Sequence, residues 1–384
     1  MRGILVALLL LLIPTSAAAE PIIQADAAIL IEASTGRVIY EKNADQVRPP
    51  ASMTKMMTCI LGLERLPKKT LIPMSDVAIY TEDNSFQWAP GDIIQADELL
   101  LGMMMVSDNG AAVAVAQTVA GTVPQFAAMM NEKAQEIGCT STNFANPNGL
   151  PNKYHYSTAR DMAKIAMYGM KMPAFRKIVA AIEEPIHWAS PSNKIDVAIT
   201  TNEMLEYYDG MNGIKTGWTN AAGGCFAGSA KRGNVELITI IMHSPDTQTR
   251  FDDAAKLLDY GFKRVNMLRV INKDRVRKLV FVQNGVQATV HARLLEDLSF
   301  PILDGEDTEK LRITYELPKM VEAPIQKGQI LGYARLKYNG EVVASVPMVA
   351  EESVKNGFSL TSKLIGLAAP VINLAQNVLV AFFA

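Results

Sequence analysis

The chain contains 384 residues, of which 49% are hydrophobic and 20% charged, and its formal net charge is −2. This length and hydrophobic content allow a sizeable core and about two domains, and they exclude a disordered chain and a protein with many membrane spans. The near-neutral charge, without Lys/Arg-rich runs, argues against nucleic-acid binding. The scattered positions of three cysteines and four histidines argue against a disulfide scaffold, a metal site or a bound cofactor.

The N-terminal segment has the composition of an export signal. Met1-Arg2-Gly3 is weakly positive, residues 4–13 are apolar, and Ala17-Ala18-Ala19 supplies small residues for cleavage. The apolar run is too short to span a bilayer. We therefore predict a signal peptide over residues 1–19 and an exported protein at the outer face of the cytoplasmic membrane, on its periplasmic or extracellular side.

A hairpin and a helix are predicted to follow. Residues 27–31 and 37–40 have strand composition and are joined by a turn that ends in Gly36. Pro50 cannot lie inside a helix, whereas residues 53–66 are largely apolar and compatible with one. The short stretch between them therefore falls at a helix N-terminus.

Ser52 and Lys55 occupy that N-terminus, three residues apart, and their side chains are expected to lie within reach of each other. A lysine amine can take the proton of a serine nucleophile only if burial or nearby cations lower its pKa from about 10.4. Free backbone N–H groups at a helix start also favour negative charge on a reacting oxygen. Taken alone, the pair favours the plainer interpretation of a helix cap and a surface lysine, because this spacing arises roughly once by chance in a chain of this length.

The middle of the chain alternates between helices and strands. A helix that is apolar nearly all round is predicted over residues 97–105, and such a helix is buried in a large core. Thr122 and Gln125 form a capping box that opens a helix closed by Gly138, and Thr158 caps another. Further predicted elements are a helix at 111–119, a turn-rich loop at 144–156, a helix ending at 170, strands at 197–200, 224–230 and 235–242, and a helix at 250–261.

The last third of the chain has a different residue pattern. Short strand-like segments separated by Gly, Pro, Asp and Asn predict a small all-β domain, with strands at 279–282, 288–290, 312–315, 332–336 and 342–347. Residues 361–384 are apolar except for a narrow polar stripe, and Lys363 is their only charge. We predict an amphipathic helix that anchors the chain in the membrane plane; a membrane-spanning segment and a helix packed on its own protein are the alternatives.

Three motifs occur in order, each at the boundary of an element: Ser52-Met-Thr-Lys55, Ser107-Asp108-Asn109 and Lys215-Thr216-Gly217. This ordered set occurs in penicillin-binding proteins and class A β-lactamases. With its β domain and terminal helix, the chain resembles the low-molecular-mass penicillin-binding proteins that are D-alanyl-D-alanine carboxypeptidases. The resemblance also covers Asn148-Gly149-Leu150 and residues 155–161, although members often carry histidine where this chain has Asn148.

The resemblance implies an α+β fold, in which a β-lactamase/DD-peptidase-like antiparallel sheet is flanked by helices. Its catalytic domain spans residues 20–268, the all-β domain 269–358 and the anchoring helix 359–384. Ser52 is implied to attack the carbonyl between the two terminal D-alanines of a peptidoglycan stem peptide, and Lys55 to accept its proton. Ser107 and Asn109 are implied to relay the proton and to hold the amide of the substrate. Lys215, Thr216, Gly217, Trp218 and Arg250 are implied to bind the substrate carboxylate or stabilise the oxyanion, the match for Arg250 being one of spacing. β-Lactam antibiotics are expected as covalent inhibitors.

Three other functions share these motifs. A class A β-lactamase needs a glutamate in the loop after the second motif, and residues 143–156 contain no acidic residue. A catalytically idle module that binds stem peptides or antibiotics is disfavoured by the complete set of reactive groups. A DD-endopeptidase uses the same groups and stays open. Asp108 is expected to shape its turn, and the cysteines Cys59, Cys139 and Cys225 to be buried.

Overall fold

The computed structural model describes residues 20–357, which form two units divided between Arg264 and Val265. The predicted signal peptide and C-terminal helix lie outside the described residues. Between residues 20 and 357, no individual helix combines the length and hydrophobicity of a membrane span; only two successive helices taken together do so, and they are bent by 84°.

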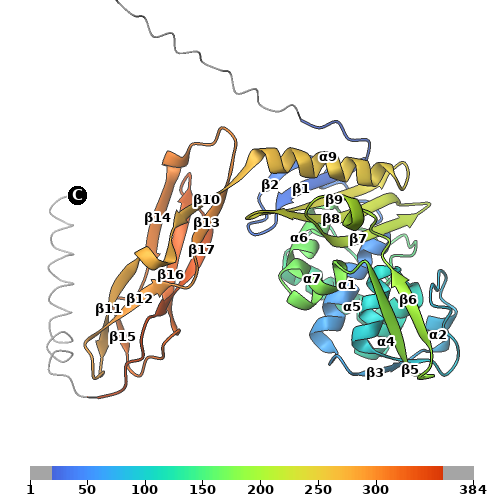
Figure 1. Ribbon diagram of the computed structural model, residues 1–384, viewed down its shortest axis with the longest axis horizontal. Helices are drawn as coiled ribbons and strands as arrows, with labels where there is room; N and C mark the ends of the chain where they lie inside the picture. Colours follow the sequence, from blue (N-terminus) through green and yellow to red (C-terminus); the bar gives the residue numbers. More distant parts are fainter. Residues whose placement is uncertain (1–19, 358–384) are drawn as a thin grey trace, which may run out of the picture. The chain divides into compact units, whose positions relative to one another are not determined.

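The first unit is built on a five-stranded antiparallel sheet in the order β2 (Val38–Lys42), β1 (Ala27–Glu32), β9 (Val235–Ser244), β8 (Gly223–Arg232) and β7 (Met211–Thr219). All six residues of β1 are buried, because successive side chains point to opposite faces and both faces are covered. Helix α9 (Thr249–Arg264) covers one face, and a group of helices that includes α6 (Ala159–Met170) covers the other (Figure 1). This arrangement confirms the predicted antiparallel sheet flanked by helices.

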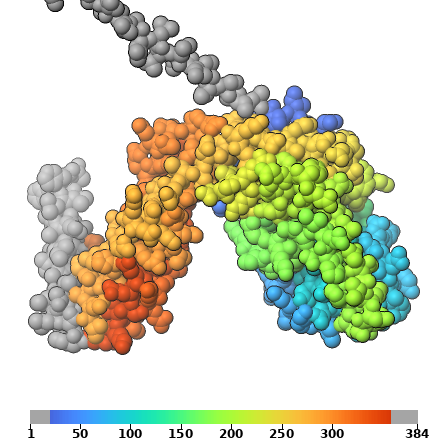
Figure 2. Space-filling model, viewed as in Figure 1, coloured from blue at the N-terminus to red at the C-terminus, as the bar shows by residue number. Residues whose placement is uncertain are grey.

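The helical side of this unit carries α1 (Lys55–Arg65), α3 (Ala96–Met105), α4 (Asn109–Ala120), α5 (Val123–Ile137) and α7 (Pro173–Val179), with the short α2 (Asp76–Ile79) and α8 (Met204–Tyr207). A small sheet borders them, in the order β3 (Leu71–Pro73), β4 (Ile93–Gln95), β5 (Glu183–Ser190) and β6 (Ile195–Ile199). In the space-filling view, α9 in yellow lies on one side of the unit and the segments in lighter blue and cyan lie on the opposite side (Figure 2).

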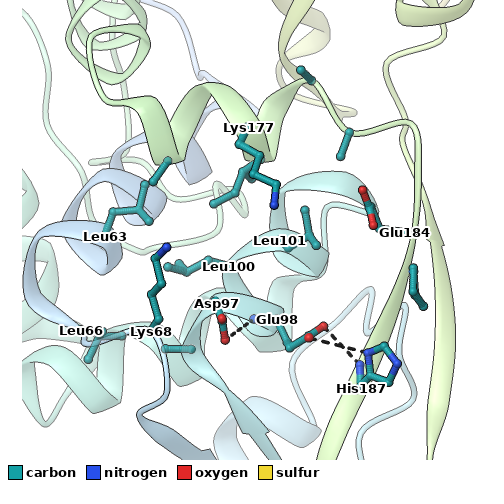
Figure 3. A pocket seen from close by; sticks show the side chains of 16 residues that line it. Leu63, Leu66, Lys68, Asp97, Glu98, Leu100, Leu101, Lys177, Glu184 and His187 are labelled. Carbon is teal, nitrogen blue, oxygen red and sulfur yellow. Dashed lines mark hydrogen bonds and ion pairs between the residues drawn. The ribbon is translucent and has the colours of Figure 1, made fainter.

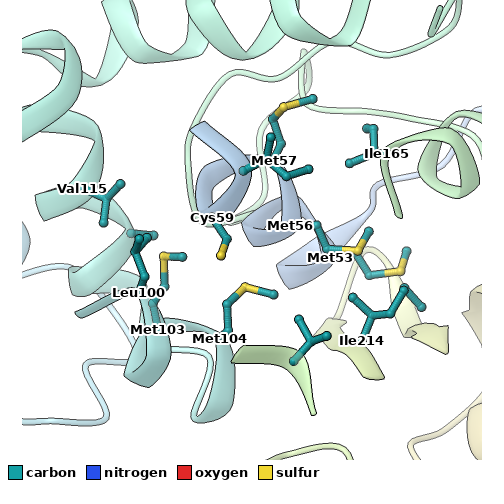
Figure 4. Packing of buried hydrophobic residues seen from close by; sticks show 14 of the residues in the cluster. Met53, Met56, Met57, Cys59, Leu100, Met103, Met104, Val115, Ile165 and Ile214 are labelled. Atoms are coloured by element: carbon teal, nitrogen blue, oxygen red, sulfur yellow. The ribbon is translucent and has the colours of Figure 1, made fainter. Parts of the chain in front are cut away.

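The core of the first unit joins the elements that carry the three motifs. Met53, in the turn that precedes α1, and Met56 and Met57, at the start of α1, are fully buried. They belong to the same cluster as Met104 of α3 and Ile214 of β7, which Figure 4 shows around α1. Burying such side chains stabilises a fold by about 1.5–3 kcal/mol each. The same packing that stabilises the unit therefore brings residues 52–55, the end of α3 and strand β7 together.

Several predicted helix ends are confirmed. The Thr122 hydroxyl accepts a hydrogen bond from the Gln125 N–H at 3.3 Å, and Gly138 ends α5 with a φ of +91°. Thr158 caps α6 in the same way. Helix α7 and strand β5 were not predicted: α7 has only seven residues, and Pro185 within β5 argues against a strand in the sequence.

The second unit is all-β, as predicted, with 3-10 turns at Lys273–Arg275 and Thr308–Lys310. Its six-stranded sheet has the order β14 (Leu311–Glu316), β16 (Ile330–Tyr338), β17 (Glu341–Ala350), β12 (Thr289–Leu294), β11 (Arg277–Gln283) and β15 (Met320–Glu322). Strands β10 (Val265–Ile271) and β13 (Leu298–Leu303) pair separately. The core of this unit is aliphatic and includes Val280, Leu294 and Leu336.

Candidate active site

The first motif lies where a 3-10 helix runs into an α-helix. Residues Ala51–Thr54 form the 3-10 turn, so α1 begins at Lys55 and not at Met53 as predicted from the sequence. Ala51 has a φ of +48°, in the left-handed region that residues other than glycine seldom adopt. Ser52 is partly exposed, whereas Lys55 is fully buried. The Lys55 Nζ lies 2.9 Å from the Ser52 Oγ, within hydrogen-bond distance.

The surroundings of Lys55 fix the direction of its lone pair when the amine is neutral. Nζ also lies 2.6 Å from the Asn109 Oδ1 and 2.9 Å from the Asn148 carbonyl oxygen. Both of these oxygens can only accept hydrogen bonds. They take the two N–H bonds of a neutral amine, and the lone pair then faces the Ser52 hydroxyl. Burial lowers the pKa of Lys55 to about 7, so a substantial fraction is neutral at physiological pH.

The second motif is held by its central residue. Ser107 has a φ of +63° and is partly exposed, and no hydrogen bond of its hydroxyl is found among residues 20–357. The buried Asp108 carboxylate caps α4 by accepting from the Ala111 N–H at 2.6 Å. It also accepts from Trp88 Nε1 and from the Phe86 N–H, each at 3.0 Å. Asp108 thus shapes the turn, as predicted, and points Asn109 at Lys55.

Replacing Asp108 with alanine is expected to lower the free energy of unfolding by about 3–5 kcal/mol, because three buried donors lose their acceptor and α4 loses its cap. Thermal or urea unfolding measures this loss. Asp97→Ala is the matched control, since Asp97 lies in the first turn of α3 but is partly exposed. Its carboxylate accepts from a single N–H, that of Glu98 at 3.2 Å, and forms an ion pair with the exposed Lys69. Equal losses in the two variants would show that the Asp108 contacts do not stabilise the turn.

The third motif lies on β7, an edge strand of the sheet. Gly217 packs against the nucleophile turn: a Cβ at this position would lie 3.0 Å from the Ser52 nitrogen. Lys215 is buried, and its Nζ donates to the Thr216 carbonyl at 3.0 Å. The Thr216 hydroxyl lies 2.5 Å from the Thr201 hydroxyl, and Trp218 is 43% exposed.

Arg250, on α9, is buried and completes a cluster of cations. Its guanidinium donates to the Gly217 carbonyl at 2.9 Å and therefore lies next to the third motif on β7. Burial, together with the charges of Lys55 and Arg250, holds the pKa of Lys215 well below its ordinary value. No carboxylate among the described residues forms an ion pair with Lys55, Lys215 or Arg250. Burying basic side chains without an ion-paired anion is costly, so this cluster is suited to an anionic ligand.

One contact of the site was missed from the sequence. The Asn148 group that reaches Lys55 is its backbone carbonyl, which any residue at this position supplies. The difference from the histidine that family members often carry there therefore leaves this contact unchanged. A backbone acceptor leaves no side-chain signal in a sequence, so only the folded loop could reveal it.

A cavity of about 600 Å³ lies elsewhere in the unit, between the C-terminal part of α1, α3, α7 and β5. Leu63, Leu66 and Leu100 line it, and Lys177 and Lys68 extend into it (Figure 3). None of the nine predicted site residues borders this cavity. Cys59, Cys139 and Cys225 are buried free thiols, as predicted, and burial raises the pKa of each.

Comparison with known proteins gives matches along nearly the whole described chain. Residues 14–246 match the family model described as D-alanyl-D-alanine carboxypeptidase, and residues 266–356 match that of the penicillin-binding protein 5 C-terminal domain. The D-alanyl-D-alanine carboxypeptidase DacF of Bacillus subtilis is 34% identical, with 88% of each chain covered. DacC of Escherichia coli is 30% identical over 91% of this chain and 90% of its own. The crystal structure of penicillin binding protein 5 from Haemophilus influenzae aligns with a TM-score of 0.68 at 27% identity, covering 88% of this chain and 99% of that one.

Proposed function

The chain belongs to the D-alanyl-D-alanine carboxypeptidase family, and on that premise we propose that its Ser52 removes the terminal D-alanine from peptidoglycan stem peptides through an acyl-enzyme. The observation that carries the proposal is the contact of a buried Lys55 amine with the Ser52 hydroxyl, near the basic side chains of Lys215 and Arg250. Neither of these two side chains forms an ion pair within residues 20–357. A hydroxyl beside a base of pKa about 7 is an activated nucleophile. The cations supply what a free C-terminal carboxylate requires.

In the acylation step, the Ser52 oxygen attacks the carbonyl carbon of the penultimate D-alanine while its proton passes to Lys55. The negative charge that develops on the carbonyl oxygen needs donors that are already in place, and the backbone N–H groups of Ser52 and Trp218 are proposed for this role. The tetrahedral intermediate then collapses and expels D-alanine, whose nitrogen takes up a proton through Lys55 and Ser107. Asn109 holds the substrate amide, and water later cleaves the ester.

The substrate carboxylate is proposed to lie near Lys215, Thr216 and Arg250. An incoming carboxylate would counter the repulsion between the cations, and it would favour the charged form of Lys215. A substrate without a free C-terminal carboxylate would leave this repulsion uncompensated and would bind less favourably. The cation cluster thus favours a carboxypeptidase, which acts at the end of a stem, over an enzyme that needs no free terminus.

β-Lactams are proposed to acylate Ser52, and the resulting acyl-enzyme is proposed to be hydrolysed slowly. The loop of residues 143–156 carries no Asp or Glu, so it holds no carboxylate that could activate the deacylating water. We also propose that residues 361–384 attach the exported enzyme to the membrane surface, because they are apolar with a narrow polar stripe.

The proposal is tested with the purified chain and a stem pentapeptide that ends in D-Ala-D-Ala. We expect one D-alanine to be released per peptide, and release to stop after incubation with penicillin. Peptide mapping by mass spectrometry should place the penicilloyl group on Ser52. Rapid turnover of nitrocefin would instead indicate a β-lactamase, and binding of the pentapeptide without D-alanine release would indicate a sensor.

A further inference from the structure

A buried chain of hydrogen bonds leads from the loop after the second motif to the residue that precedes the nucleophile. The Ala145 N–H donates to the His155 Nδ1 at 3.0 Å. The His155 Nε2 lies 2.7 Å from the Thr54 hydroxyl, and that hydroxyl donates to the Ala51 carbonyl at 2.7 Å. The side chains of Thr54 and His155 are almost completely buried.

The direction of every link follows from the ends of the chain. A backbone N–H can only donate, so the His155 Nδ1 must accept and the ring proton must lie on Nε2. The Ala51 carbonyl can only accept, so the single hydroxyl proton of Thr54 points to it. The Thr54 oxygen is then free to accept from the His155 Nε2–H. Burial lowers the pKa of His155 to about 4, which agrees with a neutral ring carrying one proton.

The peptide unit at the end of this chain is enclosed on both sides. A Cβ at Gly149 would lie 1.9 Å from the Ala51 oxygen, so only glycine allows the loop to approach so closely. A Cβ at Gly217 of β7 would lie 3.0 Å from the Ser52 nitrogen. Because a peptide unit is planar, the Ala51 carbonyl and the Ser52 N–H turn together. Fixing the carbonyl therefore fixes the N–H.

We propose that His155 and Thr54 are positioning residues for the oxyanion: they hold the Ala51–Ser52 peptide so that the Ser52 N–H is in place before the substrate arrives. This inference rests on the proposed function, in which that N–H stabilises the tetrahedral intermediate. Preorganised donors of this kind are effective because they need no reorganisation during the reaction. Loosening the peptide should therefore slow acylation more than it weakens substrate binding.

Thr58 offers a matched control one turn further along α1. It is as buried as Thr54, and its hydroxyl donates to the Pro147 carbonyl of the same loop at 2.6 Å. Its hydroxyl forms no hydrogen bond with the Ala51–Ser52 peptide. The loop also keeps its own bonds, from the Gly149 N–H to the Asn146 Oδ1 at 2.7 Å and from the Leu150 N–H to the Asn148 Oδ1 at 3.1 Å. Loss of the Thr58 bond should therefore leave the catalytic peptide in place.

The experiment compares Thr54→Val, Thr54→Ser and Thr58→Val. We expect Thr54→Val to lower kcat and the acylation rate constant for a fluorescent penicillin by about 10- to 100-fold, a part of the loss expected for removing an oxyanion donor, with KM changed less than about threefold. Thr54→Ser keeps the hydroxyl and should restore most of the rate. Thr58→Val should stay within about threefold of the wild type. Equal rates for Thr54→Val and Thr58→Val would overturn the inference.

A second pair covers the case in which Thr54→Val does not fold. His155→Gln keeps a donor that can reach Thr54, whereas His155→Phe fills the space without one. We expect acylation to be slower in His155→Phe than in His155→Gln by at least about fivefold, on the scale of a misplaced catalytic group. Equal rates would contradict the inference. A wild-type chain that neither releases D-alanine nor binds penicillin would refute the proposed function itself, independently of both pairs.

Discussion

Replacing Ser52 with alanine is expected to abolish D-alanine release, with a fall in turnover on the order of 10⁶-fold, as for removal of other serine nucleophiles. Ser52 is partly exposed, and its hydroxyl contacts Lys55 alone among the described side chains, so the fold should tolerate the change. The variant should also lose covalent labelling by a fluorescent penicillin. Turnover is measured by enzymatic detection of D-alanine, and labelling by gel fluorescence and intact mass.

The matched control is Ser192→Ala. Ser192 is exposed in the turn between β5 and β6, and its loss should change neither turnover nor labelling. Both variants should keep the thermal midpoint of the wild type within about 2 °C, since neither removes a buried group. Labelling that persists in Ser52→Ala would assign the nucleophile to another residue and remove the basis of the proposed mechanism.

The ends of the helices could be predicted because their signals are local. Thr122 and Gly138 act at α5 through residues three or four positions away, and Thr158 does the same at α6. The approach of Ser52 to Lys55 could also be anticipated, since three residues along a helical turn bring side chains together. The order of the three motifs does not by itself determine that they lie together in space. That depends on the packing of α1, α3 and β7 around the buried methionines.

Other parts of the site have no sequence signal. The Asn148 carbonyl and the Ala51–Ser52 peptide act through the backbone, which every residue shares. The contact between Thr54 and His155 joins positions 101 apart in the chain, and neither residue type indicates a partner at that distance. Arg250 was predicted from its spacing in the resemblance, but its bond to the Gly217 carbonyl was not, because Arg250 lies on α9, on the other side of the sheet from α6. Such contacts become visible only when the sheet is assembled.

Replacing Lys55 with methionine is expected to lower the rate of acylation by roughly 10²- to 10⁴-fold, the contribution typical of a general base. Methionine fills a similar volume but cannot take a proton, and it leaves the Asn109 Oδ1 and the Asn148 carbonyl without the donor they have in the wild type. Lys55→Arg is the informative companion, because a guanidinium can donate to both oxygens yet stays protonated at any accessible pH. If positioning alone mattered, Lys55→Arg would recover activity; we expect it to be as slow as Lys55→Met.

The pH dependence separates a base from a merely structural lysine. The base must be neutral, and burial lowers the pKa of Lys55 to about 7, so kcat/KM of the wild type should rise with pH through a midpoint near 7 and level off above it. Below the midpoint the rate should fall about tenfold per pH unit, because the neutral fraction does so. This limb should be absent from the residual activity of Lys55→Met. A limb with the same midpoint in that variant would assign the titration to another group, because the variant has no amine left at this position to lose a proton.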